Sequence, residues 1–208
     1  MEPGSIALIV LLALLFFTYL GLLERVLERM RLNRLQALVI LLMLVLGGGL
    51  PAVPLAAGLE VNIGGMLIPV GICIYLLLKA ETAWEKNRAL LASLATAAIT
   101  ATAERILPLE PGFLFFDVDA LYFPPLVAGL IAYLLGRSRR ASFIAGVFGV
   151  LLLDVIAWLE NVMRGFADIT VQLGGGGVFG GAVMAGLLAV LLAEIIGEIR
   201  ERIWSGPG

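Results

Sequence analysis

Long uncharged apolar runs recur along this chain, and they constrain its fold more than any other feature. Residues 6–23 contain no charged side chain, and comparable runs follow through most of the sequence. A membrane span needs about 20 mainly apolar residues. Apolar residues make up 61% of the chain and charged residues 14%, whereas soluble domains average about 45–50% and about 25%. The sequence therefore predicts an all-α, polytopic membrane helix bundle that forms a single transmembrane domain over residues 1–208.

The runs predict about seven spans. They cover residues 6–23, 35–50, 61–78, 89–105, 120–136, 141–160 and 176–197. The first run has no basic amino-terminal flank and no small-residue cleavage motif, so we interpret it as a retained span rather than a signal peptide. The basic segment 24–34 has apolar residues at helical spacing, which predicts a short interfacial helix.

The basic residues give an orientation for these spans. All lysines and arginines except Arg105 and Arg164 fall on one side of the seven-span arrangement. Because cytoplasmic loops carry an excess of Lys and Arg, we expect a multi-pass protein of the cell membrane. Its amino terminus lies outside and its carboxy terminus in the cytoplasm.

Several kinds of site are excluded by residue types that the chain lacks. It has no histidine, and Cys73 is its single cysteine, so zinc–histidine sites, His-ligated haem and an internal disulfide are excluded. No basic patch with interleaved aromatic residues points to nucleic acid. We therefore expect no metal and no cofactor, with the lipid bilayer as the main partner.

A five-residue pattern occurs twice, 110 residues apart, as Val61-Asn62-Ile63-Gly64-Gly65 and Val171-Gln172-Leu173-Gly174-Gly175. Each copy carries a side-chain amide and paired glycines, and each precedes an apolar helix that runs in the same direction. The pattern predicts broken helices after Val61 and Val171, in a parallel repeat of three spans, one connecting span and three spans. Interruptions at corresponding places in two halves are typical of a transport site. The alternative interpretation is two unrelated turns.

Asp154 is the most site-like single residue, because it lies within the apolar sixth span. A carboxylate there costs about 2.5–3.5 kcal/mol on insertion scales and usually faces the bundle interior or a water-filled cavity. We therefore predict a site for an ion or small polar solute between Asp154 and the two breaks. Its predicted residues are Asp154, Asn62, Gln172, Gly64, Gly65, Gly174 and Gly175. A structural carboxylate and simple amide caps are the alternatives.

Four stretches carry a family resemblance. They are residues 61–70, 124–128, 144–154 and 173–181. In these stretches and in their order, the chain resembles the DUF1614 family of uncharacterised bacterial and archaeal membrane proteins. The resemblance implies the class of membrane protein and carries no activity. Gly180 stands where the family often has a second aspartate, so a mechanism with paired aspartates would lose one member here.

Three functions remain open. The first is a transporter- or channel-like protein for an ion or small polar solute, with Asp154 as the intramembrane carboxylate. The second is an intramembrane aspartyl protease, which needs a second carboxylate beside Asp154. Asp119, Asp117 or Glu160 would have to supply it.

The third function is a non-catalytic scaffold subunit. The pairs Gly176/Gly180 and Gly177/Gly181 form GxxxG patterns that favour close helix packing, including packing in a homo-oligomer. Gly146 predicts similar packing in the sixth span. On balance the sequence favours a protein that is not an enzyme.

Overall fold

The computed structural model describes residues 3–30, 32–106, 123–166 and 168–204, in two compact units, 1–42 and 43–208. The first unit holds α1 (Pro3–Arg29) and the start of α2 (Arg34–Gly48). The separate interfacial helix expected over residues 24–34 is wrong, because α1 continues without interruption to Arg29. Residues 24–29 contain no glycine or proline that would end a helix.

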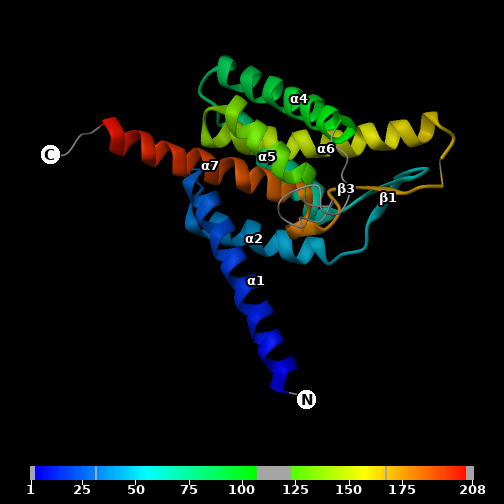
Figure 1. Cartoon of the computed structure of the whole chain (residues 1–208), viewed down its shortest axis with the longest axis horizontal. Coiled ribbons are helices and arrows are strands. Elements are labelled where there is room, and N and C mark those ends of the chain that lie inside the picture. Colours follow the sequence, from blue (N-terminus) through cyan, green and yellow to red (C-terminus); the bar gives the residue numbers. More distant parts are fainter. Residues whose placement is uncertain (1–2, 31, 107–122, 167, 205–208) are drawn as a thin grey trace. The chain divides into compact units, whose positions relative to one another are not determined.

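The second unit contains five helices after the end of α2. They are α3 (Ile68–Leu78), α4 (Ala83–Ile106), α5 (Phe123–Gly136), α6 (Arg139–Met163) and α7 (Gly181–Trp204). The helices α4 to α7 pack side by side as a bundle, and α3 lies against α6 (Figure 1). The prediction of a mainly helical chain is confirmed, with seven α-helices in the described parts.

Small side chains allow the four bundle helices to approach closely. Each helix contributes one alanine to a buried cluster, and the four are Ala92, Ala132, Ala145 and Ala189. A Cβ added at Gly146 would lie 2.8 Å from the backbone of Ala185 on α7, so the close packing predicted for Gly146 is confirmed. Such small-residue contacts are the usual basis of helix association in lipid.

Local signals explain where the bundle helices begin. The Ser138 hydroxyl accepts a hydrogen bond from the Ala141 N–H at 3.2 Å and caps α6. The Thr82 hydroxyl caps α4 in the same way, with the Glu85 N–H as donor. Pro124 and Pro125 stand in the first turn of α5, where a missing N–H is tolerated. The starts of α5 and α6 lie two or three residues from the predicted spans, whereas α4 begins at Ala83, six residues before the predicted start.

A three-stranded sheet departs from the all-α expectation. Its strands are β1 (Val53–Ala56), β2 (Leu59–Val61) and β3 (Val171–Leu173). The order is β1-β2-β3, with β1 antiparallel and β3 parallel to β2. No strand was expected from the sequence, because strands of three or four residues leave little pattern to detect.

The seventh helix also begins later than expected. It starts at Gly181 rather than at residue 176, and a 3₁₀ turn (Gly177–Phe179) precedes it. Gly176 and Gly177 have φ values of 82° and 57°, in the left-handed region that a helix excludes. The two GxxxG patterns therefore do not form a helix face, and the prediction that they pack helices together is wrong.

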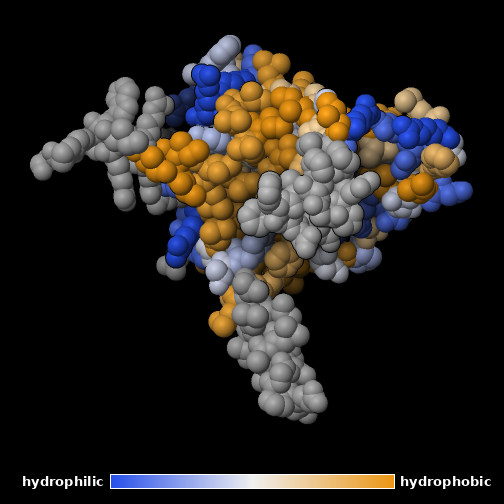
Figure 2. Space-filling view, viewed as in Figure 1, coloured by the Kyte–Doolittle hydropathy of each residue, from blue (hydrophilic) through white to orange (hydrophobic). Residues whose placement is uncertain are grey.

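The surface of α4 to α7 is apolar. Two described helices, α4 and α6, are long and apolar enough to cross a membrane, by length and composition alone, and four shorter helices are apolar. Figure 2 shows an apolar face over α5 and α7, with hydrophilic residues toward the two ends of the bundle. Leu126, Leu130 and Leu134 line the exposed side of α5.

Candidate functional site

The two predicted breaks meet in space. Strand β2 leads through Asn62 into a π-helical turn (Ile63–Leu67) and then α3, while β3 leads through the 3₁₀ turn into α7. The parallel pairing places Val61 opposite Leu173, and the Asn62 N–H donates to the Leu173 carbonyl at 3.0 Å. In the predicted repeat, Val61 corresponds to Val171. In the sheet Val61 instead pairs with Leu173, so the strand pairing is shifted by two residues from the repeat.

Glycines bring three backbone segments into direct contact at this point. We call Gly48, Gly64, Gly65, Gly174 and Gly177 the glycine junction. A Cβ at Gly64 or at Gly177 would lie 2.6 Å from the Cα of Gly48, and a Cβ at Gly65 would collide with the Gly174 carbonyl oxygen. At four of these positions no side chain larger than hydrogen fits without a backbone shift, whereas a Cβ at Gly48 would make a tight contact of 3.1 Å with the Cα of Gly177.

Asp154 reaches the glycine junction from α6. The Gly174 N–H donates a hydrogen bond to Asp154 Oδ2 at 3.1 Å. Gly174 has a φ of 67°, a left-handed conformation that residues other than glycine avoid. The carboxylate thus accepts the hydrogen bond from a glycine at the start of a turn. The second oxygen, Oδ1, makes no hydrogen bond within the described parts of the chain. Asp154 therefore fastens the second break to α6 and keeps one oxygen available for another group.

The two amide side chains of the breaks differ in their roles. Asn62 is buried, and its Oδ1 accepts from the Gly65 N–H at 2.8 Å, which caps the turn that opens α3. This is the helix-cap interpretation that the sequence left open. Gln172 is half-buried on β3, and Glu60 is its partner across the sheet. Residues 172–175 form a turn in which the Gly175 N–H donates to the Gln172 carbonyl. The structure thus brings Asp154, Asn62 and the paired glycines together.

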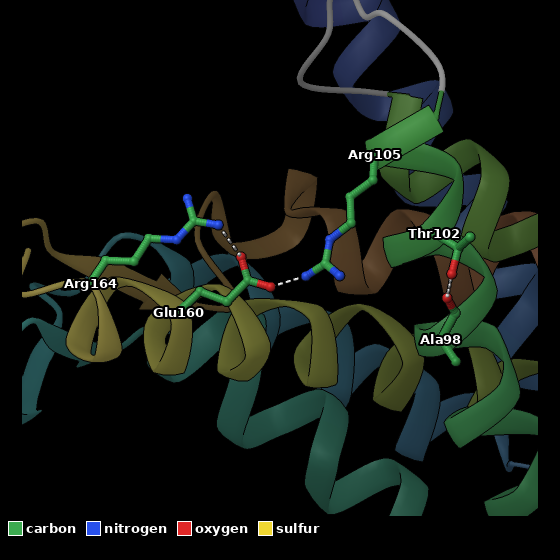
Figure 3. A network of polar contacts seen from close by, with 5 residues as sticks. All are labelled: Ala98, Thr102, Arg105, Glu160 and Arg164. Atoms are coloured by element: carbon green, nitrogen blue, oxygen red, sulfur yellow. Dashed lines mark hydrogen bonds and ion pairs between the residues drawn. The ribbon is translucent and has the colours of Figure 1, made fainter.

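The carboxylates that could act together with Asp154 lie in different surroundings. Glu160 lies between Arg105 of α4 and Arg164 and forms ion pairs with both (Figure 3). Glu160 is therefore occupied and is not a partner of Asp154. Glu104 of α4 is partly buried and lies one helical turn beyond Thr100. Asp117 and Asp119 fall outside the described residues.

A row of small polar side chains on α4 faces α6. Ser93, Thr96 and Thr100 are all buried and recur at helical spacing, with Glu104 one further turn along. The Ser93 hydroxyl donates to Ala89 and Ile144 carbonyls, but neither Thr96 nor Thr100 has a hydroxyl hydrogen-bond partner in the described structure. By contrast, the exposed Thr102 donates to the Ala98 carbonyl at 2.7 Å (Figure 3).

The register of α4 against α6 places this row beside Asp154. The two helices run in the same direction, because Ser93 contacts Ile144 near one end and Arg105 contacts Glu160 near the other. Thr100 consequently falls at about the level of Asp154. Unpaired buried hydroxyls are uncommon, and an ion or water that binds them is one explanation.

Sequence reasoning missed two elements of the site. Gly48 contributes to the glycine junction but is not among the residues predicted for the site. Trp158 is not among them either, yet its indole N–H donates to the Ala57 carbonyl at 3.1 Å, and its ring packs on the cluster of Leu59, Val61 and Leu173. The only signal for Trp158 was its position one turn after Asp154, on the same side of α6.

Comparison with known proteins places the chain in a family. No curated protein and no solved structure matches it. A family model described as a protein of unknown function matches residues 23–192, which include every residue of the glycine junction and Asp154. This chain therefore belongs to the DUF1614 family.

Proposed function

We propose that the chain is a multi-pass integral membrane protein with a transporter- or channel-like function for an ion or small polar solute. The observation that carries the proposal is that the two segments without regular helix, which lead into α3 and α7, meet beside Asp154. Backbone without regular helix is tolerated at membrane depth only where protein buries it or where it lines a cavity. Paired interruptions of this kind form the binding sites of many transporters.

The membrane location in this proposal rests on α4, which buries its small side chains and exposes its large apolar ones. Its buried face consists of alanine, serine and threonine, whereas Leu91, Leu94 and Ile99 are exposed. Soluble proteins bury their large apolar residues and rarely expose contiguous apolar patches. A lipid environment reverses this preference, because leucine is as apolar as the lipid tails and only small residues gain from close contact.

The orientation follows from the same bundle. The ends of α3 and α5 and the starts of α4 and α6 carry Lys79, Arg88, Arg137 and Arg139, whereas Arg105 and Arg164 lie near the opposite ends of α4 and α6. Under the positive-inside rule, the basic end faces the cytoplasm. The glycine junction then lies toward the outer side.

Oxygen atoms dominate the polar groups of the proposed site. Asp154 offers its Oδ1, which has no hydrogen-bond partner among the described residues, and Thr96 and Thr100 add hydroxyl oxygens on α4. Glu104 adds a carboxyl group one turn further along α4. Carboxylate and hydroxyl oxygens are ligands for small hard cations, and they also relay protons. The chemistry therefore favours a cation or a proton as the transported or coupled species.

The test measures thermal unfolding of the purified protein across a panel of alkali and alkaline-earth cations and across pH. Asp154→Asn keeps an oxygen that accepts from Gly174 and removes the charge. Asp168→Asn is the matched control, because Asp168 is exposed in the connection that precedes β3. A ligand at 100 times its Kd stabilises the folded state by about 2.7 kcal/mol.

We expect one cation or acidic pH to stabilise the wild type and Asp168→Asn but not Asp154→Asn. Uptake of that cation, or of protons, into proteoliposomes should then be lost in the same variant. If Asp154→Asn unfolds at a lower temperature than the wild type but keeps every response, Asp154 is a structural residue. The scaffold interpretation would then take the place of the transport proposal.

A further inference from the structure

A groove lies between α5 and α7 at the basic end of the bundle, away from the glycine junction. Its volume is about 380 Å³. The lining residues are Tyr133, Leu134, Arg137, Ala193, Ile196 and Gly197. Leu134 and Ile196 are exposed apolar residues, so the groove has an apolar floor with one cationic side chain at its end.

Arg137 occupies an unusual backbone conformation. Its φ is 55°, and it is the single residue other than glycine with a positive φ in the described parts of the chain. It follows the last residue of α5, and its N–H donates to the Tyr133 carbonyl at 3.3 Å. Glycine is the usual residue at this position after a helix. An arginine in a conformation that favours glycine indicates that its side chain has a use.

The guanidinium of Arg137 is also unengaged. The two arginines that follow it both have partners: Arg139 forms an ion pair with Glu194, and Arg140 donates to the Lys79 carbonyl at 3.4 Å. Arg137 is exposed and has neither an ion pair nor a side-chain hydrogen bond to any residue that the structure describes. An exposed cation that is unpaired among the described residues, beside an apolar groove, complements an amphipathic anion.

We propose that this groove binds one anionic phospholipid. The acyl chain lies along Leu134 and Ile196, and the phosphate pairs with the Arg137 guanidinium, which suits the geometry of phosphate oxygens. Basic pockets between membrane helices on the cytoplasmic side bind anionic headgroups in this way. The inference rests on the membrane location proposed above and is independent of transport at Asp154.

Two variants remove the site by different routes. Arg137→Gly removes the cation and also relieves the positive φ, so the protein should unfold at the wild-type temperature or above in neutral detergent. Gly197→Leu fills the groove, because a Cβ at Gly197 meets no atom within 4 Å. Arg164→Gln is the control, since it removes an exposed arginine from the opposite end of α6.

The experiment adds phosphatidylglycerol or phosphatidylcholine with matched acyl chains, or inorganic phosphate, to the protein in neutral detergent. The readouts are the Tm and native mass spectrometry. We expect phosphatidylglycerol alone to raise the Tm by several degrees and to give a one-lipid adduct. Arg137→Gly and Gly197→Leu should lose both effects, whereas Arg164→Gln and Asp154→Asn should keep them.

Three outcomes would overturn the lipid site. These are an undiminished phosphatidylglycerol shift in Arg137→Gly, an equal shift with phosphatidylcholine, and a full shift with inorganic phosphate. Because Asp154→Asn is expected to keep the lipid response, failure of the transport proposal and failure of the lipid proposal give different results.

Discussion

The two ends of the α4–α7 bundle are held together in different ways. At the basic end, side chains make the connections: Arg88 donates to the Gly136 carbonyl at the end of α5, and Arg139 pairs with Glu194 of α7. At the opposite end, backbone meets backbone through the glycine junction, and Asp154 is the side chain that fastens it to α6.

The difference determines how each end responds to substitution. A lost side-chain contact removes one interaction, and the neighbours relax around the gap. A side chain added where two backbones touch forces whole segments apart, because neither backbone can rotate away. We therefore expect a graded response at the basic end and a severe response at the glycine junction.

The largest effect is expected for Gly65→Ala. The new methyl group would collide with the Gly174 carbonyl oxygen, which would separate β2 from β3 and break the contact to Asp154. Overpacking of this kind costs typically about 1–3 kcal/mol and sometimes more, and a backbone collision belongs at the upper limit. Chemical denaturation in detergent, or the yield of folded protein, measures the loss.

Gly71→Ala is the matched control for this substitution. Gly71 lies in α3, and a Cβ there meets nothing within 4 Å. Alanine favours a helix over glycine by about 1 kcal/mol, so this variant should be as stable as the wild type or slightly more so. Equal losses of stability in Gly65→Ala and Gly71→Ala would contradict the assignment of a special role to the glycine junction.

An intermediate effect is expected for Arg88→Met at the basic end. The substitution keeps an unbranched chain but removes the hydrogen bond to the Gly136 carbonyl. Hydrogen bonds to charged groups contribute about 1.5–3 kcal/mol. Arg140→Met serves as control, because the hydrogen bond from Arg140 to the Lys79 carbonyl is long, at 3.4 Å. The same denaturation curves should show a smaller loss of unfolding free energy for Arg140→Met. A loss of equal size would mean that the hydrogen bond from Arg88 to the Gly136 carbonyl has no special weight.

The smallest effect is expected for Arg105→Gln, which sharpens the comparison. Arg105 lies at the same end of α4 as the glycine junction but pairs with Glu160 on the surface, with 66% of its side chain exposed. Exposed ion pairs contribute about 0–1 kcal/mol. A larger loss in the unfolding free energy would mean that this whole end of the bundle is sensitive, and not only the backbone crossing.

The helices and their order were predictable because each one is specified locally. Long apolar runs predicted every helix of the bundle, and Ser138 and the pair Pro124-Pro125 mark two of the boundaries. Apolar runs of this length carry a strong composition signal, which is read from neighbouring residues alone. The same signals predicted that Asp154 and the two Gly-Gly pairs were special, and the structure brings them together.

The strands and the glycine junction were not predictable, since both depend on partners distant in the chain. Strand β3 has three residues, and its pairing with β2 exists only because α6 returns the chain to that point. No sequence pattern indicated the role of Gly48 either. Its contacts with Gly64 and Gly177 join three segments that no local pattern relates.

The sequence by itself determined a helical chain, the sites of its breaks and the position of one carboxylate within an apolar helix. It did so because composition and periodicity act over neighbouring residues. Tertiary structure alone decided that the breaks pair in parallel, that Asp154 binds Gly174, and that Thr96 and Thr100 face α6 without hydrogen-bond partners in the described structure. These features follow from the register between helices, which is set by the fit of small side chains across many contacts at once.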